Sequence, residues 1–187
     1  MISFKLFRMN VRLHFSFLLL LSIFLLLEQL EQGSRFLLAV LWHELGHLLV
    51  LLAQKQQVTL LDCSAFGIRM ERSSCGTFWQ DFLLHLAGPA FNLLATLFLL
   101  PWNKLSAIFH LVLATLNLLP ILPMDGGNLA ALVLGQLLPP RAAERSCRLL
   151  SSLTWTLLLL LGAWLFLRHW NPAMLIFTIL LAFQCSA

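Results

Sequence analysis

The chain has 187 residues, of which 60% are hydrophobic and only 11% are charged. Soluble domains carry roughly a quarter of their residues as charged side chains. This composition therefore excludes an ordinary soluble enzyme, a disordered chain and a disulfide scaffold, and it indicates a protein embedded in a lipid bilayer. The formal net charge of +4 does not indicate a nucleic-acid partner, because charge in a membrane protein is interpreted by its position along the chain.

Six apolar stretches approach or exceed the length of about 20 residues that a spanning helix needs. We therefore expect an all-α polytopic membrane protein with six transmembrane helices, folded as a single domain over residues 1–187. The first stretch follows basic residues, as in a secretory signal, but no cleavage site follows it, so we expect it to be retained. The expected spans are Val11–Leu30, Phe36–Ala53, Phe78–Leu100, Leu105–Leu122, Leu149–Leu167 and 172–187.

Positive charges near the ends of spans favour the cytoplasmic side. An orientation with both termini in the cytoplasm leaves only three of the 12 basic residues outside, namely Arg35, Lys104 and Arg168. The four cysteines then lie at the cytoplasmic face without C-x-x-C spacing. We interpret them as reduced, small apolar residues.

Two long segments, 54–77 and 123–148, fall on the cytoplasmic side in this layout. In the first, Val58–Leu61 and Phe66–Glu71 have the composition of two short strands, which predicts a β-hairpin after the second span. A hairpin edge beside a membrane needs a partner. An extended substrate can add to that edge, which makes Phe66 and Gly67 candidate substrate-binding residues.

The second span contains His43-Glu44-Leu45-Gly46-His47. In a helix, residues four apart lie on one face, so the two imidazoles can bind one metal ion. This is the H-E-x-x-H pattern, in which two histidines hold Zn²⁺ and the glutamate acts as the general base. The alternative is that the two histidines only form hydrogen bonds between helices, but polar groups within a span are costly and mark functional sites.

Catalytic zinc usually has three protein ligands, and the third has several candidates: Asp125, Asp81, His85 and Asp62. Asp125 follows a segment that Pro120 and Pro123 keep from being helical, and two glycines after it permit tight turns. The expected layout brings it to the same side of the membrane as His47. The alternative for Asp125 is a helix N-cap.

Two further spans carry polar stripes. In the third span, Asp81, His85, Gly88 and Asn92 share one helical face. The fourth span has a similar stripe of Ser106, His110 and Asn117. Asn92 and Asn117 are candidates for hydrogen bonds to a substrate backbone, with hydrogen bonds between helices as the alternative.

These residues resemble the site-2 proteases, a family of intramembrane zinc metalloproteases. The resemblance covers nearly the whole chain and rests on three motifs in order: His43–His47, Ala87–Asn92 and Asn117–Gly127. It is strongest toward the sporulation branch, whose protease processes a membrane-associated pro-sigma factor. Within these residues we expect neither the regulatory CBS domain that this branch usually carries nor the PDZ domains of other members.

The resemblance implies a role for each matching residue. His43, His47 and Asp125 would bind Zn²⁺, Glu44 would be the general base, and Asn117, Pro120 and Pro123 would face the substrate. It also implies a membrane-associated protein substrate, with membrane inhibitors or other regulatory proteins as further partners. A hypothesis from another class is a metal carrier or metal-sensing scaffold that uses the same ligands, although Glu44 beside them argues for catalysis.

Overall fold

The computed structural model describes residues 2–6, 9–15, 22, 30–64, 67–72, 76–170 and 178–179. The chain divides into two compact units, residues 1–116 and 117–187.

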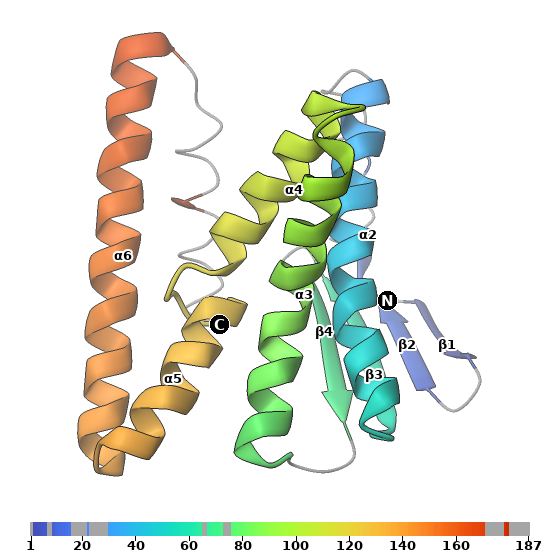
Figure 1. Ribbon diagram of the computed structural model, residues 1–187. Coiled ribbons are helices and arrows are strands. Elements are labelled where there is room, and N and C mark those ends of the chain that lie inside the picture. The colour runs from blue at the N-terminus through green and yellow to red at the C-terminus, as the bar shows by residue number, and fades with distance from the viewer. Residues whose placement is uncertain are drawn as a thin grey trace. The chain divides into compact units, whose positions relative to one another are not determined.

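In its described residues the first unit contains the helices α2 (Leu30–Ala53), α3 (Phe78–Leu99) and α4 (Lys104–Asn117) (Figure 1). α2 and α3 lie close together at Gly46, where an added Cβ would lie 2.9 Å from the backbone oxygen of Ala87. At the same level, Trp42 Nε1 donates a hydrogen bond of 3.0 Å to the carbonyl of Phe91. The absence of a side chain at Gly46 therefore lets the two helices approach closely.

The first unit also contains a four-stranded sheet in the order β1-β2-β3-β4. The predicted hairpin is confirmed, because β3 and β4 pair antiparallel with Asp62 opposite Arg69. The expectation of an otherwise all-α chain is wrong, because two N-terminal strands extend this sheet and β2 pairs parallel to β3. The strands are β1 (Ile2–Leu6), β2 (Met9–Leu13), β3 (Val58–Ser64) and β4 (Gly67–Arg72).

The sheet changes the predicted start of the first span. Val11 is a buried residue of β2, opposite Leu61, and not the first residue of a helix. α2 begins at Leu30, six residues before the predicted Phe36. Of the first expected span, residues 16–21 and 23–29 lie outside the described residues, as do 172–177 and 180–187 of the sixth.

The second unit contains α5 (Asp125–Leu137) and α6 (Pro140–His169). Most of the expected loop 123–148 is therefore helical, and α6 begins well before the predicted Leu149. Proline at N1 of α6 suits this early start, because its missing N–H has no partner at a helix start. In the segment before α5, Ile121 is fully buried and packs against Leu158 of α6.

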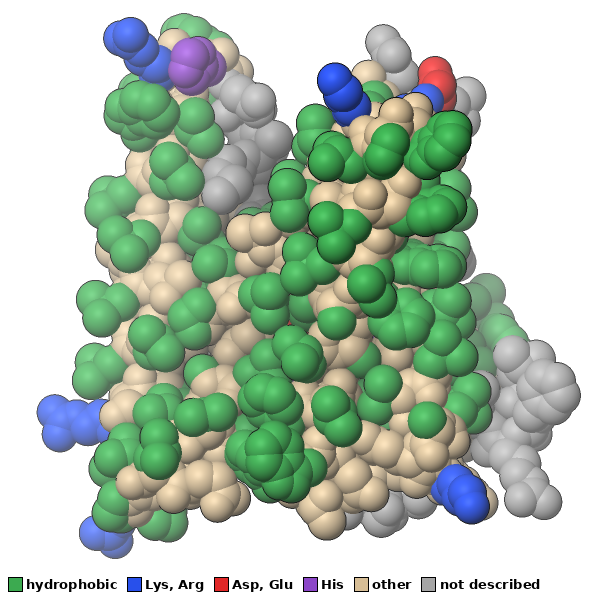
Figure 2. All heavy atoms as spheres, in the orientation of Figure 1, with side chains coloured by type: hydrophobic (Ala, Val, Ile, Leu, Met, Phe, Trp, Pro, Cys, Tyr) green, Lys and Arg blue, Asp and Glu red, His purple; other side chains and the backbone are tan. Residues whose placement is uncertain are grey.

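The helices have the length and surface of membrane spans. In the described part of the chain, three are long and apolar enough to cross a bilayer: Glu31–Ala53, Phe78–Leu99 and Pro140–His169. Figure 2 shows hydrophobic side chains along the helices of both units and Lys and Arg near helix ends. α4 is shorter than the predicted span Leu105–Leu122 because it ends at Asn117. These helices support an integral membrane protein, while six spans and their orientation stay predictions.

Candidate metal centre

Two histidines of α2 converge on one point. His43 and His47 are one turn apart, and their Nε2 atoms are separated by 3.1 Å. Two nitrogens that each lie about 2.0–2.1 Å from one tetrahedral zinc ion are about 3.3 Å apart. The pair therefore has the spacing of two ligands to a single ion.

The carbonyl of Leu84 on α3 fixes the orientation of His47. His47 Nδ1 lies 2.8 Å from this oxygen, which can only accept, so Nδ1 carries the proton and donates it. Nε2 of His47 then holds a lone pair. Proteins usually orient a metal-binding histidine through a hydrogen bond from its other ring nitrogen, as Leu84 does here.

Gly88 of α3 leaves space beside both histidines. A Cβ built on Gly88 would lie 2.6 Å from His43 Nε2 and closer still to His47 Nε2. Real Cβ atoms essentially never approach neighbours under 3.0 Å. The missing side chain therefore opens a space, within coordination range of both nitrogens, that any other residue would fill.

Asn92 of α3 and His110 of α4 continue the polar contacts behind His43. Asn92 Nδ2 lies 3.2 Å from His43 Nδ1, and His110 Nδ1 lies 2.9 Å from Asn92 Oδ1. All three side chains are buried, and Asn92 has no exposed surface. Glu44 directly follows His43 on α2 and is half-buried. The sequence placed His110 on a polar stripe but assigned it no role.

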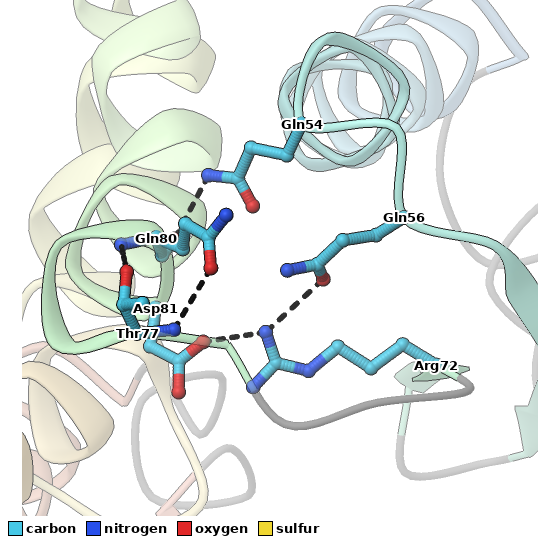
Figure 3. Close-up of polar contacts among 6 residues, drawn as sticks. All are labelled: Gln54, Gln56, Arg72, Thr77, Gln80 and Asp81. Carbon is cyan, nitrogen blue, oxygen red and sulfur yellow. Dashed lines mark hydrogen bonds and ion pairs between the residues drawn. The ribbon is translucent and has the colours of Figure 1, made fainter.

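Asp81, one candidate for the third ligand, is paired with a cation instead. Arg72, at the end of β4, forms an ion pair of 2.5 Å with it and also donates to Gln56 (Figure 3). Thr77 and Gln80 form a capping box at the start of the same helix, α3. The ion pair connects the hairpin to the first turn of α3.

The other candidates in the first unit are also separate from the histidine pair. Asp62 lies in β3, and its Oδ1 is 3.0 Å from His14 Nε2. Among the described residues of this unit, no Asp, Glu, Cys or further His joins His43 and His47 as a third potential ligand, and that includes His85. The first unit as described therefore supplies two ligands.

In the second unit, Asp125 is the first residue of α5. Its expected alternative as an N-cap is wrong, because Met124 occupies that position and makes no side-chain capping bond. The two glycines after Asp125 lie against backbone: a Cβ on Gly126 would collide with the backbone of Leu118, and one on Gly127 would lie 2.4 Å from the carbonyl carbon of Ile121. Asp125 thus begins a helix that packs against the segment before it.

Ser151 of α6 holds that segment. Its hydroxyl accepts a hydrogen bond from the amide of Leu122 and donates one to the carbonyl of Pro120, both at 3.2 Å. The carbonyl of Pro123 accepts from Asn128 Nδ2 at 3.1 Å. Ser151 could not be recognised from the sequence, since a serine in a long apolar helix has no distinctive spacing.

The remaining candidates for substrate contact occupy different places. Asn117 is the last residue of α4, and Gly67 is the first residue of β4, which lies at an edge of the described sheet. Phe66 lies outside the described residues. Substrate contact by these residues stays a prediction.

Comparisons with known proteins find two sequence relatives. A protein named as a zinc metalloprotease from Synechocystis is 37% identical over 53% of this chain and 30% of its own length. Stage IV sporulation protein FB of Bacillus subtilis is 31% identical over 68% of this chain and 48% of its own. The chain thus spans less than half the length of these relatives. No protein-family model matches it.

A solved structure shares the fold. The site-2 protease of Methanocaldococcus jannaschii aligns over 99% of this chain and 93% of its own, with a TM-score of 0.72 and 20% identity. The two sequence relatives are named as a zinc metalloprotease and as a sporulation protein, and the solved structure shares the fold.

Proposed function

We propose that this chain belongs to the site-2 protease family and is an intramembrane zinc metalloendopeptidase that hydrolyses a peptide bond in or near a membrane-associated segment of a regulatory protein. The observation that carries the proposal is the convergence of the Nε2 atoms of His43 and His47, 3.1 Å apart beside Gly88. A pair of imidazoles, of which His43 is buried and His47 is half-buried, next to a carboxylate is costly in a membrane unless it has a function.

We assign the zinc ligands as His43, His47 and Asp125. Two imidazole nitrogens and one carboxylate oxygen are able to provide one ligand atom each. This donor set leaves a position open for chemistry at a four-coordinate ion. The assignment of Asp125 is supported by its place in the third motif, and by the pairing of Asp81 with Arg72 and of Asp62 with His14.

Zinc in such a site supplies a Lewis acid that polarises the scissile carbonyl and makes water acidic near neutral pH. Glu44 accepts the proton of the attacking water and then delivers it to the leaving amine nitrogen. His47, held by Leu84, keeps its lone pair directed to the site. The apolar helices around these groups exclude bulk water.

The substrate has to be extended at the cleavage site, because a helix hides its peptide bonds. We assign the binding of this extended segment to Phe66 and to the edge strand β4, which begins at Gly67. An extended segment can bind there by strand addition. Asn117, Pro120 and Pro123 flank that segment. The similarity to stage IV sporulation protein FB makes a membrane-associated pro-sigma factor the substrate class to test first, with membrane regulators as partners.

The test measures zinc and cleavage together in the detergent-purified chain. Wild type is expected to hold close to one zinc per chain, and the double variant His43→Ala/His47→Ala none. Glu44→Gln is expected to retain zinc but to lose cleavage of a library of transmembrane-segment peptides, with products read by mass spectrometry. Freely exchanging metal with no Glu44-dependent product would support the carrier hypothesis and overturn the protease.

A further inference from the structure

A cluster of polar side chains joins the edge strand β4 to the two helices α2 and α3. Arg72, the last residue of β4, donates from Nη1 to Asp81 Oδ1 on α3 at 2.5 Å (Figure 3). The same nitrogen donates to Gln56 Oε1, just after the end of α2, at 3.2 Å. One guanidinium thus attaches β4 to the last turn of α2 and the first turn of α3, and all three elements belong to the first unit.

Both acceptors of Arg72 are themselves held in place. Asp81 belongs to the first turn of α3, which starts with a capping box. Gln56 follows Lys55, whose φ is +56°, and its amide donates to the carbonyl of Leu51 at 3.0 Å. This is the hydrogen-bond pattern of a Schellman motif, which fixes the path of the chain as it leaves a helix. The attachment point of β4 is therefore rigid on both helices.

The cluster lies on the helix faces that also hold the metal centre. Asp81 precedes Gly88 by seven residues on α3, and Gln54 follows His47 by seven residues at the end of α2. Seven residues make nearly two turns, so each pair shares a face, and they span about 10 Å along the axis. Gln54 Nε2 also donates to the carbonyl of Gln80 at 3.0 Å, which joins the two helices directly at this level. The strand is thus attached two turns from the metal centre.

Gly76, between β4 and α3, leaves room for this attachment. A Cβ on Gly76 would lie 2.9 Å from Arg72 Nη1 and closer still to Asp81 Oδ1. A side chain at this position would therefore displace the ion pair. The backbone of Gly76 and the two charged side chains fit together only because the glycine has no side chain.

The position of β4 along the helices matters for an extended substrate. A segment that adds to the strand edge takes its register from that strand through main-chain hydrogen bonds. Successive residues of a strand are about 3.3 Å apart, whereas a misplacement of about 1 Å at the reacting groups can lower a rate about 100-fold. A shift of β4 by one residue would bring a different peptide bond to the metal centre. Pairing with β3 does not prevent this shift, because the two strands can move together.

We propose that Arg72 is a positioning residue that determines which peptide bond of the substrate is cleaved, by fixing the edge strand β4 relative to α2 and α3. Asp81 and Gln56 act as its acceptors on the two helices. This inference rests on the proposed function, in which β4 binds the extended substrate. It assigns the choice of the cleaved bond to side chains that take no part in the chemistry.

The test follows the cleavage position in Arg72→Ala, Asp81→Ala and the double variant, on the full chain in detergent. The probe is a transmembrane-segment peptide that wild type cleaves at one bond, with products read by mass spectrometry. In all three variants kcat at that bond is expected to fall by about 10–100-fold, and products from neighbouring bonds are expected to appear. KM is expected to stay within a few-fold, because the strand edge still binds the peptide. The double variant should equal the single ones, since both side chains act through one contact.

Two further variants serve as controls. Arg12→Ala removes an exposed arginine from β2 of the same sheet and is expected to cleave as wild type does. Arg72→Lys keeps a cation for Asp81 and is expected to restore the wild-type bond as the main site. Zinc affinity, measured by competition with a chelator, and hydrogen exchange of the β3–β4 hairpin are expected to match wild type in every variant.

Three results would overturn the inference. The first is cleavage by Arg72→Ala at the wild-type bond alone with unchanged kcat, and the second is an equal spread of products in Arg12→Ala. The third is faster exchange of the hairpin in Arg72→Ala, which would mean that the arginine keeps the strands folded and does not position them. Absence of any Glu44-dependent cleavage by wild type that holds zinc would instead overturn the proposed function.

Discussion

Gly88 on α3 faces His43 on α2 so closely that a Cβ on the glycine would lie 2.6 Å from the His43 Nε2 atom. The glycine is a member of the buried face of α3, together with Ala87, Pro89 and Asn92. Small residues on this face let the helix backbone approach the imidazoles. The space that remains is the one in which a metal ion would have to lie.

The substitution Gly88→Ala is therefore expected to abolish zinc binding while α2 and α3 still form. The added methyl group would occupy the position beside both Nε2 atoms, and the rings cannot turn away without losing the bonds to Leu84 and Asn92. Zinc content of the purified variant, with circular dichroism for helix content, checks this. Gly135→Ala is the control, since a Cβ there meets nothing within 4 Å. Stoichiometric zinc in Gly88→Ala would contradict the geometry of the site.

The assignment of Asp125 makes a comparison with Asp81 informative. Asp125→Ala is expected to lower zinc affinity by roughly 100-fold or more, because loss of a ligand exceeds the 10–100-fold effect of losing an outer-shell partner. Asp81→Asn is expected to keep full affinity, because its carboxylate is paired with Arg72. Competition with a chelator measures both. The reverse order of the two variants would move the third ligand to α3.

The sequence was sufficient to bring the two histidines of α2 together, because the spacing of the motif specifies their geometry. Two histidines four apart on a helix must share a face, and the 3.1 Å between their Nε2 atoms follows from that spacing. The hairpin of β3 and β4 was also predictable, since its strands are adjacent in sequence. Local patterns of this kind need no knowledge of the rest of the chain.

Long-range pairings were not predictable. The segment Asn10–Leu13 alternates polar and apolar residues, but its strand depends on a parallel partner, β3, some 50 residues away. Without that partner, the apolar residues after Arg12 resemble the start of a span. The pairing of Asp81 with Arg72 could not be predicted either, because it joins two different elements. Helical spacing placed Asp81 on one face with His85 and contained no information about the hairpin.

Ser151 is expected to stabilise the segment that leads to Asp125. Ser151→Ala removes the hydroxyl shared by the amide of Leu122 and the carbonyl of Pro120, and a hydrogen bond contributes about 0.5–1.5 kcal/mol to stability. Hydrogen exchange over residues 118–128, measured by mass spectrometry, should become faster. The neighbouring Ser152→Ala is the control, because that exposed hydroxyl bonds only to Leu149 within its own helix. Equal exchange in the two variants would show that Ser151 does not hold the segment.

The ion pair of Arg72 with Asp81 is expected to contribute to stability where most surface pairs do not. Both side chains are largely buried, at 22% and 17% exposure, and a hydrogen bond to a charged group is worth about 1.5–3 kcal/mol. In a double-mutant cycle with Arg72→Ala and Asp81→Ala, we expect a coupling energy of about 1–2 kcal/mol, below that range because of the remaining exposure. The control cycle uses Glu144 and Arg148, which are 3.7 Å apart and about 70% exposed, and should give under about 0.5 kcal/mol. Thermal unfolding in detergent, followed by circular dichroism, measures both cycles. Equal coupling in the two cycles would mean that the pair does not fasten the hairpin to α3, and that the edge strand β4 is held by its pairing with β3 alone.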